Sequence, residues 1–557
     1  MVASTSAASP GTAAPTVVTA SSVAYENNEL VIAATATAPE QRIHDDETLF
    51  IVRRQEHDGQ PVEYHVCWLR EPTASPTSAS GDSAQQDQSV SSAPPPPPFA
   101  FFTTILDESA ARKLPEDVLR RHLLADIAPV FQEDDGPTSS ASSSLHVIVS
   151  TRSGLGQAQV FYDDVLKPLL GVFGLAAVTG AGEAVPKGQK SYNLLVTSSS
   201  RSIAEFAQTL GKTSAKSTGA PTTIVLLSGD GGVVDLLNGV AEQDEEADMR
   251  QLPAIALLPL GTGNALFHSL HRPDYLAAAS AAASQEGSEK LVSKGPSSFV
   301  LGLRALFKGH AAPLPNFEAR FSPGSHTVSY SLQEEEGKEA ALKEQAENVD
   351  RLRGAIVASY GFHAQLVWES DTPEYRKHGD KRFGMAAQEL LKTSHSYDAD
   401  VSFVEAGATT GEPHHIGHRF NYVLASMVSN LERTFTISPA SEPLDGQLRL
   451  VHFGDVGGAK TMDIMMAAYN NGAHVGMQWP KAESGKPAES KDVDTKEHAE
   501  ESVGYDAIDE LQVNVLEQDS RWRKICIDGT IVEIPQGGWM KVRKAPKPVL
   551  QVIVDRD

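Results

Sequence analysis

Two consecutive stretches of this 557-residue sequence each consist of an apolar run, a glycine-rich turn and a second apolar run with helical spacing. The first is TTIVLLSGDGGVVDLLNGV (222–240), and the second is LPAIALLPLGTGNALFHSL (252–270). Apolar runs that switch in this way predict a buried strand followed by a helix. Two such units in a row indicate a doubly wound α/β sheet, in which the loops gather at the carboxyl ends of parallel strands.

Two further stretches upstream repeat the pattern. LHVIVSTRSGLGQAQVFYDDVLKPLL (145–170) and YNLLVTSSSRSIAEFAQTL (192–210) each begin with a strand pattern that ends in hydroxyl side chains and an arginine. The free amides at a helix N-terminus favour bound phosphate. Four units that present Gly, Ser, Thr, Arg and Asp at one sheet edge therefore predict a nucleotide phosphate site.

The first glycine turn contains one acid, Asp230. A carboxylate has the wrong charge for holding phosphate, but it can coordinate Mg²⁺ or accept a proton from an attacking hydroxyl group. The alternative is an ordinary tight turn in which Asp230 caps a helix. Other nucleotide motifs are excluded, because a Walker loop ending at LGKT needs glycine where Phe206 stands, and GTGNAL lacks the third glycine of a dinucleotide fingerprint.

SGDGGVVDLLNG followed by PLGTGNALFHSL resembles the diacylglycerol and sphingosine kinase superfamily, and is most similar to fungal-type or plant-type sphingoid long-chain-base kinases. Three more segments resemble motifs of this family and stand in the family's order. They are STRSGLGQA, ASYGFHAQLVWESDTPEYRKHGDKRFG (358–384) and ICIDGTIVEI (525–534). The resemblance extends from about residue 145 to 535.

The resemblance implies a role for each matching position. Asp230 would be the base that activates the lipid hydroxyl, and Ser228, Gly229 and Gly231 would lie between the nucleotide and the lipid headgroup. Asp235 stands where the family usually has Glu, and Thr530 replaces another usual Glu. The implied nucleotide contacts are Ser150, Thr151, Arg152, Thr197, Ser198, Ser199, Ser200, Arg201, Asp235, Gly261, Thr262, Gly263, Arg376, Arg382, Asp528, Gly529 and Thr530.

In sphingoid-base kinases an acid shortly after Gly-Phe faces the lipid amine. Counting forward from Gly361 and Phe362 gives Gln365 or Val367, whereas counting back from Tyr375 gives Glu369. The counts disagree by two residues, which indicates an insertion between them. Glu369 is the candidate for this substrate contact.

The resemblance implies an ATP-dependent lipid kinase that uses Mg²⁺ and transfers the γ-phosphate to the primary hydroxyl of a sphingoid long-chain base. A diacylglycerol or ceramide kinase is the close alternative. An inactive lipid-binding or scaffold protein of the same fold is the alternative from another class.

The composition of the chain restricts its cellular compartment and its partners. Only Cys67 and Cys526 are present, which favours a reducing compartment, and a formal net charge of −25 argues against nucleic acid as a partner. The chain starts without a secretory or transit pattern, and no apolar run approaches the ~20 residues of a membrane span. We expect a cytoplasmic protein that associates reversibly with membranes. The candidate segment for membrane docking is GGWMKVRKAPK (537–547). The alternative for that segment is a hairpin whose lysines face water.

The expected fold is an α/β nucleotide domain followed by an antiparallel β-sandwich that binds lipid. The predicted parts are a disordered tail (1–25), a small β-rich module (26–72), a Ser/Pro-rich linker (73–98), a helical connector (99–143), the α/β kinase domain (144–284) and the β-sandwich (296–557) with a disordered insertion (481–504).

Overall fold

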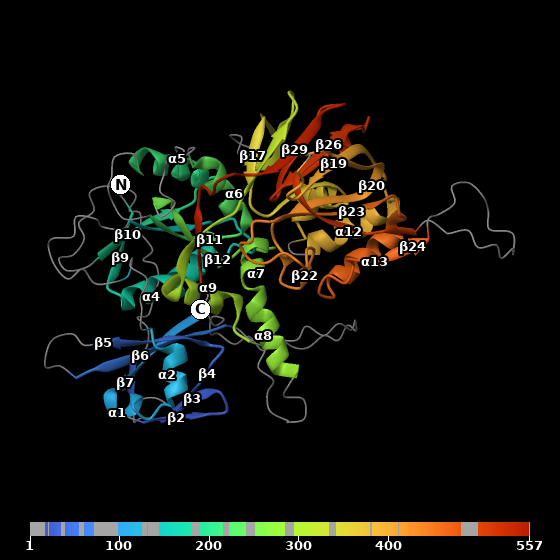
Figure 1. The fold of residues 1–557 in the computed structure, drawn as a ribbon. Helices are drawn as coiled ribbons and strands as arrows, with labels where there is room; N and C mark the ends of the chain where they lie inside the picture. Colours follow the sequence, from blue (N-terminus) through green and yellow to red (C-terminus); the bar gives the residue numbers. More distant parts are fainter. Residues whose placement is uncertain are drawn as a thin grey trace, which may run out of the picture.

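A computed structural model describes the chain as three packed parts: a small N-terminal module, an α/β lobe and a C-terminal β-rich lobe (Figure 1). The structure describes residues 17–20, 22–34, 39–54, 61–71, 99–124, 131, 144–179, 190–214, 222–240, 251–283, 295–333, 341–378, 381–409, 411–480 and 500–555. The predicted linker (73–98) and most of the predicted insertion (481–504) lie outside these ranges.

The α/β lobe is built on a seven-stranded sheet with the order β13-β30-β12-β11-β8-β10-β9. The predicted parallel sheet is confirmed, because every neighbouring pair from β9 to β30 is parallel and only β13 runs antiparallel. The strands are β8 (Leu145–Val149), β9 (Leu175–Val178), β10 (Lys190–Val196), β11 (Thr223–Ser228), β12 (Ala254–Pro259), β13 (His310–Pro313) and β30 (Gln551–Val554).

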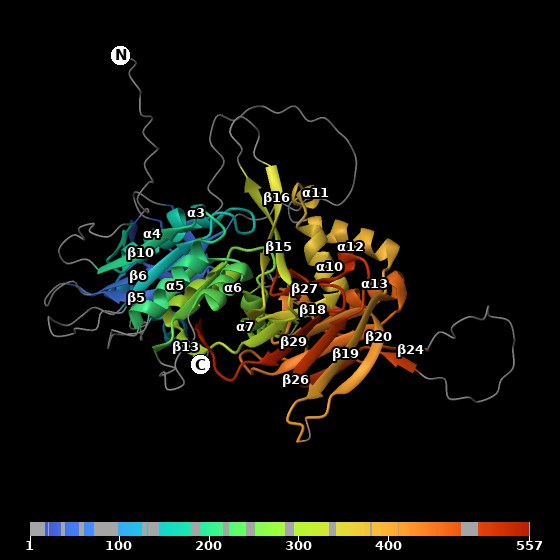
Figure 2. The ribbon, with the colours of Figure 1, turned by 90° about the horizontal axis from the view of Figure 1, so that it is seen from above.

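Helices cover both faces of this sheet, as in a doubly wound fold (Figures 1 and 2). Apolar residues of α5, α6 and α7 pack on one face, and those of α3, α4 and α9 pack on the other. The helices are α3 (Ala158–Phe161), which continues through a π-helical turn (Tyr162–Leu166) into α4 (Lys167–Val172), α5 (Ser202–Ser214), α6 (Asp230–Gly239), α7 (Ala265–Leu270), α8 (Arg272–Ala283) and α9 (Ser298–Lys308).

The predicted boundary between the kinase domain (144–284) and the β-sandwich (296–557) is wrong at both ends of the second segment. Helix α9 and strand β13 belong to the first lobe, and β30 returns from the C-terminus to pair with β12 in register Ala254↔Gln551. The strand is recruited because its side chains are buried there, between 0% and 9% exposed. The chain therefore crosses between the lobes twice.

The C-terminal lobe is one twelve-stranded hydrogen-bonded sheet whose path is β16-β15-β28-β27-β18-β20-β19-β26-β29-β14-β17, with β23 pairing with both β20 and β26. All its pairs are antiparallel, and β23 folds the sheet back on itself. The predicted β-rich second lobe is confirmed, whereas its division into the two sheets of a sandwich stays a prediction. The strands are β14 (Phe317–Phe321), β15 (His326–Gln333), β16 (Ala341–Asn348), β17 (Arg351–Gly354), β18 (Val357–Gly361), β19 (Tyr397–Glu405), β20 (His414–Ser426), β23 (Leu448–Gly454), β26 (Gly504–Val515), β27 (Lys524–Ile527), β28 (Thr530–Glu533) and β29 (Trp539–Lys544).

Among the described residues, four α-helices and two small sheets complete this lobe. The helices are α10 (Phe362–Ser370), α11 (Pro373–Arg376), α12 (Arg382–Thr393) and α13 (Gly457–Ala468). The small sheets pair β21 (Asn430–Glu432) with β22 (Phe435–Thr436), and β24 (Gln478–Pro480) with β25 (Glu500–Ser502). Figure 2 shows the β15–β16 hairpin standing between the two lobes, close to α11.

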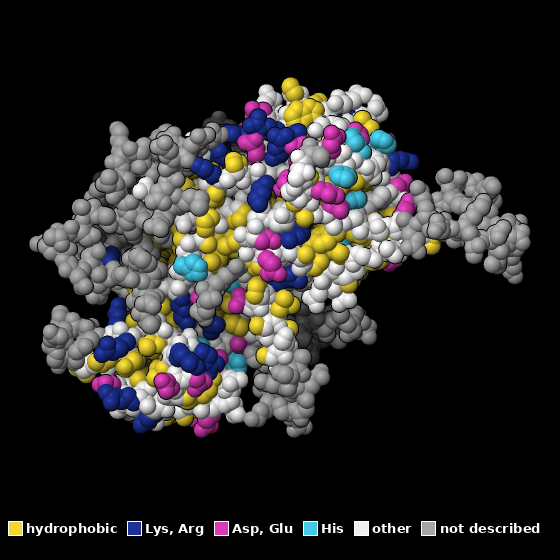
Figure 3. Space-filling view, viewed as in Figure 1, with side chains coloured by type: hydrophobic (Ala, Val, Ile, Leu, Met, Phe, Trp, Pro, Cys, Tyr) yellow, Lys and Arg dark blue, Asp and Glu magenta, His cyan; other side chains and the backbone are white. Residues whose placement is uncertain are grey.

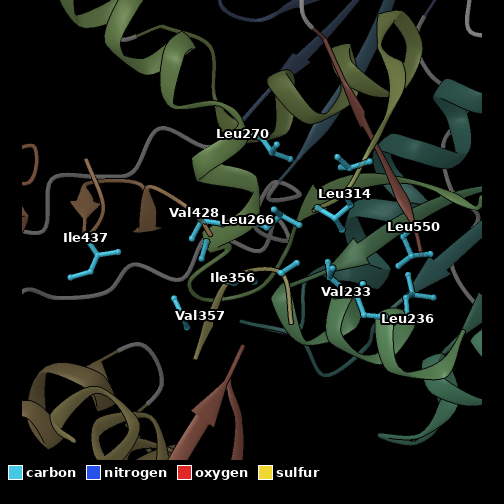
Figure 4. Packing of buried hydrophobic residues seen from close by; sticks show 14 of the residues in the cluster. Val233, Leu236, Leu266, Leu270, Leu314, Ile356, Val357, Val428, Ile437 and Leu550 are labelled. Carbon is cyan, nitrogen blue, oxygen red and sulfur yellow. The ribbon is translucent and has the colours of Figure 1, made fainter. Parts of the chain in front are cut away.

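The two lobes share one hydrophobic core. Figure 4 shows Val233 and Leu236 of α6 and Leu266 of α7 beside Ile356 and Val428 of the C-terminal lobe, and all of these belong to a single buried cluster. Burial of apolar surface stabilises such an interface by about 25 cal/mol per Å². The lobes therefore hold a fixed relation to each other in this structure.

The N-terminal module consists of two sheets, β1-β7-β6-β5 and β2-β3-β4. It packs against α9, where the Phe50 and Phe307 ring centroids are 5.0 Å apart and Arg304 donates to the carbonyl oxygens of Asp45 and Thr48. The strands are β1 (Val17–Ala20), β2 (Val23–Glu26), β3 (Glu29–Ile32), β4 (Gln41–His44), β5 (Thr48–Arg54), β6 (Glu63–Arg70) and β7 (Ala100–Asp107), followed by α1 (Glu108–Ala111) and α2 (Glu116–His122).

Two predicted boundaries of this module need correction. The predicted tail (1–25) contains β1 and the start of β2, and the predicted helical connector (99–143) begins with β7, the central partner of β1 and β6. Residues 1–16 lie outside the described part of the chain. No helix within the described ranges is long and apolar enough to cross a membrane.

Candidate active site

A cavity of about 800 Å³ opens where the carboxyl ends of the parallel strands meet the C-terminal lobe. One side, which we call the loop wall, comes from residues 150–155, 197–200 and 261–262 together with Ser228, Gly231, Gly232 and Asp235. The opposite side, which we call the arginine wall, consists of Ser329, Tyr330, Gln345, Asp371, Arg376 and Arg382. The volume lies within the ~300–1,000 Å³ typical of ligand pockets.

The loop wall is held together by hydrogen bonds between adjacent strand ends. The Thr151 amide donates to Thr197 Oγ1 over 3.1 Å, and Thr151 Oγ1 donates to the Thr197 carbonyl over 3.1 Å. Ser153 Oγ lies 3.0 Å from Ser228 Oγ, which links the loops after β8 and β11. These bonds fix the hydroxyl-rich loops at one edge of the sheet, as the sequence predicts.

Two glycines allow the loops after β11 and β12 to touch through their backbones. A Cβ atom on Gly261 would lie 2.3 Å from Gly229 Cα, and one on Gly229 would lie 2.7 Å from Gly261 Cα. Any side chain at either position would overlap the neighbouring loop. Asn264, at the left-handed φ of 52°, completes the turn by accepting from the Gly261 amide over 2.9 Å.

Asp230 sits at the first turn of α6, half-buried and next to Gly231 of the loop wall. Its two carboxylate oxygens accept hydrogen bonds from the amides of Ala265 (2.8 Å) and Leu266 (3.1 Å), the first residues of α7. Burial raises the pKa of Asp230, while these two N–H donors oppose the shift. The structure shows Asp230 capping α7, and its side chain is held next to Gly231 of the loop wall without itself lining the cavity; its role as a base stays a prediction.

Asp235 lies one helical turn further along α6 and lines the cavity. Burial raises the pKa of its carboxyl to about 6. Within the described residues no group of three His, Cys, Asp or Glu side chains could hold a metal ion. Mg²⁺ commonly binds through one or two carboxylates, phosphate oxygens and water, so a single acid at this position fits that ion.

Arg376 and Arg382 reach the cavity from α11 and α12, facing the loop wall. Both guanidinium groups bond Asp371: Arg376 through Nε and Nη2 (3.1 and 2.7 Å) and Arg382 through Nη1 (3.0 Å). The structure thus brings together the two arginines that the sequence placed at a phosphate. It also adds an acid that the sequence analysis did not single out.

Sequence comparison agrees with this arrangement. Residues 144–293 match the family model described as the diacylglycerol kinase catalytic domain. The match spans 150 of the 557 residues of the chain. No curated protein matches the chain.

Two solved structures from Bacillus anthracis str. Sterne, assigned as diacylglycerol kinases, are similar to the chain. The first has 13% identity and a TM-score of 0.40, and the second has 12% identity and a TM-score of 0.37. In both cases the similarity covers 74% of this chain and 97% of the other.

The matched residues 144–293 include the loop wall, whereas the arginine wall lies beyond residue 293. Sequence analysis did not find Ser153, Gly154, Leu155, Ile203, Gly232, Ser329, Tyr330, Gln345 and Asp371 among the cavity-lining residues. The alternation of TVSYSLQ did indicate the strand that carries Ser329 and Tyr330. Nothing in that alternation indicates that the strand borders the cavity of the kinase domain.

Several predicted site residues lie outside the lining of this cavity. Arg201 forms an exposed ion pair with Glu347 of β16 (3.3 Å). Gly229 and Gly263 serve the loop backbone, since Gly229 contacts Gly261 and Gly263 lies beside Asp230 and the Leu431 carbonyl. Glu369, the predicted reader of a lipid amine, accepts from Arg521 Nη2 (2.9 Å) and from Gln365 Nε2 (2.9 Å). This acid is therefore already paired within the C-terminal lobe.

Asp528, Gly529 and Thr530, which the resemblance implies as nucleotide contacts, lie outside the lining of this cavity, and that role stays a prediction. Asp528 and Gly529, with φ of 48° and 90°, form the two-residue hairpin turn between β27 and β28, and Thr530 pairs with Ile527. The Asp528 carboxylate accepts from the amides of Ala355, Ile356 and Val357 at 2.6 to 3.0 Å. Burial raises its pKa to about 7, against these three donors. The Asp-Gly dipeptide between β-branched residues is the hairpin signal that could have revealed this.

The predicted docking segment (537–547) is largely engaged within its own lobe. Met540 is buried, Trp539 is half-buried, and Lys541 and Arg543 both form ion pairs with Glu510 of β26. Figure 3 shows Lys and Arg side chains next to carboxylates along this edge of the lobe. The arrangement favours the alternative that this strand faces water with its charges paired.

Proposed function

We propose that this protein is an ATP-dependent kinase that transfers the γ-phosphate to the primary hydroxyl group of a membrane lipid. One observation carries the proposal: a single cavity joins the glycine and hydroxyl loops of the kinase domain, Asp235, Arg376 and Arg382. Phosphoryl transfer needs mainly positioning and charge neutralisation, and these are the groups that supply both.

The loop wall would hold the phosphate chain through backbone amides and the hydroxyl groups of Ser150, Thr151, Ser198 and Ser199. These donors suit phosphate oxygens because the loops precede helices whose amides are free. Arg376 and Arg382 would neutralise the transferring group from the opposite side, which is the usual task of a planar guanidinium fork. Mg²⁺, held by Asp235, phosphate oxygens and water, would supply further positive charge on the phosphates.

Asp230 would act as the general base. The lipid hydroxyl oxygen forms a bond to the γ-phosphorus, the bond between that phosphorus and the β,γ-bridging oxygen breaks, and ADP leaves. The hydroxyl proton passes to Asp230, whose raised pKa makes it a better proton acceptor than an ordinary aspartate. The two amides of α7 hold the carboxylate in place during this transfer.

The acceptor that the sequence resemblance implies is a sphingoid long-chain base. A specific observation favours a second candidate, a lipid with a neutral headgroup such as diacylglycerol. Glu369 already carries Arg521 as its counter-ion, and the other counted positions, Gln365 and Val367, have no charge. A cationic amine gains little from a carboxylate that is already paired.

The test is ATP turnover by the purified protein with sphinganine, diacylglycerol and ceramide in mixed micelles. Phosphorylation of any of these lipids supports the proposal, and the preferred lipid decides between the two acceptors. ATP binding without turnover on any lipid would support the scaffold alternative. Sedimentation with vesicles containing the preferred lipid tests whether the protein reaches it as a peripheral membrane protein.

A further inference from the structure

The acid between the two arginines of the cavity has no counterpart among the predicted site residues. Asp371 ends α10, at the turn before α11, within the segment where the two family counts disagree by two residues. Its Oδ1 accepts from both Arg376 Nε (3.1 Å) and Arg382 Nη1 (3.0 Å), and its Oδ2 accepts from Arg376 Nη2 (2.7 Å). One carboxylate therefore bridges two guanidinium groups that come from different helices.

The carboxylate between the two arginines offsets the repulsion between their positive charges. Two cations that share one oxygen atom as partner lie close enough to repel each other strongly, and the repulsion is greatest when no phosphate is bound. A bridging carboxylate offsets this repulsion and holds both groups at the cavity before the nucleotide arrives. Among the described residues, both arginines retain further N–H donors, because Arg376 has Nη1 and Arg382 has Nε and Nη2 outside these bonds.

The exposure of the cluster argues against a mainly stabilising role. The side chains of Asp371 and Arg376 are each 35% exposed, and that of Arg382 is 22% exposed. Ion pairs at such exposure contribute little to folding. The nearest other acid on α10, Glu369, is paired with Arg521 and so does not compete for these arginines.

We propose that Asp371 is a positioning residue that sets the geometry of Arg376 and Arg382 for binding nucleotide phosphate. It does so by remaining bound to one side of each guanidinium group while the free donors face the phosphates. The proposal rests on the proposed function only in assuming that the cavity binds a nucleoside triphosphate.

The experiment is isothermal titration of Asp371→Asn with ATP, ADP and adenosine, without lipid. We expect the Kd for ATP to rise about tenfold, as for loss of one bond to a charged group. The Kd for ADP should rise less, and the Kd for adenosine should not change, because adenosine has no phosphate. Glu374→Gln is the matched control: it removes one negative charge from exposed α11, outside the cavity lining, and should leave all three constants unchanged.

A second experiment tests whether Asp371 acts through the arginines. In an Arg376→Gln/Arg382→Gln background, adding Asp371→Asn should not weaken ATP binding further, since nothing remains to be positioned. An equal additional loss in that background would overturn the proposal, as would an equal loss of adenosine affinity, which indicates a structural role. Tighter ATP binding by Asp371→Asn would also overturn it, by showing that Asp371 competes with phosphate.

These outcomes separate the proposal from the kinase assignment. If the wild-type protein binds ATP but phosphorylates no lipid, the proposed function fails. The proposal for Asp371 is then still decided by the change in the Kd for ATP that Asp371→Asn causes. If the wild-type protein binds neither ATP nor ADP, both proposals fail.

Discussion

The two walls of the cavity recognise a ligand by different means. The loop wall uses backbone and short hydroxyl side chains, locked by hydrogen bonds such as those between Thr151 and Thr197, and by direct contact of Gly229 with Gly261. The arginine wall uses two long cationic side chains, Arg376 and Arg382, that are both bonded to Asp371. A ligand is thus bound between a rigid surface set by the fold and a surface set by ion pairs.

This difference predicts how each wall responds to substitution. Changes in the loop wall should alter folding or chemistry, because its atoms are part of the packed backbone. Changes in the arginine wall should alter nucleotide affinity and leave stability nearly unchanged, because partly exposed ion pairs contribute little to folding. The following experiments can sharpen or break this contrast.

The largest effect on kcat is expected from a substitution at Asp230, the proposed general base next to the loop wall. Asp230→Asn keeps the size of the side chain but cannot accept the hydroxyl proton, so kcat should fall by about 10²–10⁴. ATP affinity, measured by titration, should stay within a few-fold of wild type, which also shows that the loop remains folded. Wild-type turnover in this variant would remove Asp230 from the chemistry and leave it only the role of capping α7.

The next effect tests whether the loop wall depends on backbone contact. Gly261→Ala would place a Cβ 2.3 Å from Gly229 Cα, and such overpacking should lower the free energy of unfolding by about 1–3 kcal/mol. Gly231→Ala is the matched control, since among the described residues a Cβ there would meet nothing within 4 Å beyond its chain neighbours and the backbone of its own helix, and a change within about 0.5 kcal/mol is expected. Equal losses in denaturant titrations of the two variants would show that backbone contact does not define this wall.

A smaller effect on binding is expected from the arginine wall. Arg376→Ala and Arg382→Ala should each raise the KM for ATP about tenfold, through loss of one charged contact. Their denaturation midpoints and the KM for lipid should match those of the wild type. A large loss of stability in either variant would contradict the contrast between the walls, because it would mean that ion pairs also support the fold here.

The same contrast explains how much the sequence could predict. The loop wall is local: each buried strand of the parallel sheet reads as an apolar run, and its glycine or hydroxyl loop follows at once. For this reason 14 of the predicted site residues line one cavity: Ser150, Thr151, Arg152, Thr197, Ser198, Ser199, Ser200, Ser228, Gly231, Asp235, Gly261, Thr262, Arg376 and Arg382. Of these, only Arg376 and Arg382 lie in the arginine wall, and they were found through family resemblance.

The rest of the site depends on packing between distant segments. Ser329, Tyr330 and Gln345 reach the cavity because the β15–β16 hairpin stands between the lobes, which no local pattern encodes. Strand β30 begins at Gln551, 292 positions after Pro259, the last residue of β12. The two strands nevertheless pair side by side in the first sheet. The turn at Asp528 and Gly529, by contrast, is local, because an Asp-Gly pair between two strands is a hairpin signal.

An effect of similar size, which appears only on acidification, is expected at Asp235, the acid of the loop wall that would hold Mg²⁺. Its folded-state pKa of about 6 lies above the ~3.9 of an aspartate in an unfolded chain. Below pH 6 the carboxyl group is increasingly protonated, so apparent Mg²⁺ affinity in the kinase assay should fall about tenfold between pH 7 and pH 5. Asp235→Asn should bind Mg²⁺ weakly at both values and lose this dependence.

Stability should change with pH in the opposite direction. Between about pH 4 and pH 6 the unfolded chain has lost the Asp235 proton while the folded protein retains it, so the free energy of unfolding contributed by this group falls as pH rises. Denaturant titrations of wild type and Asp235→Asn across this range isolate the contribution, because the variant cannot titrate. If the Mg²⁺ affinity of the wild type does not change from pH 7 to pH 5, Asp235 does not bind the metal. If the free energy of unfolding of the two proteins also depends on pH in the same way, Asp235 has no raised pKa. The positive charge at the phosphates would then have to come mainly from the arginine wall, and the contrast between a rigid wall and a charged wall would become sharper.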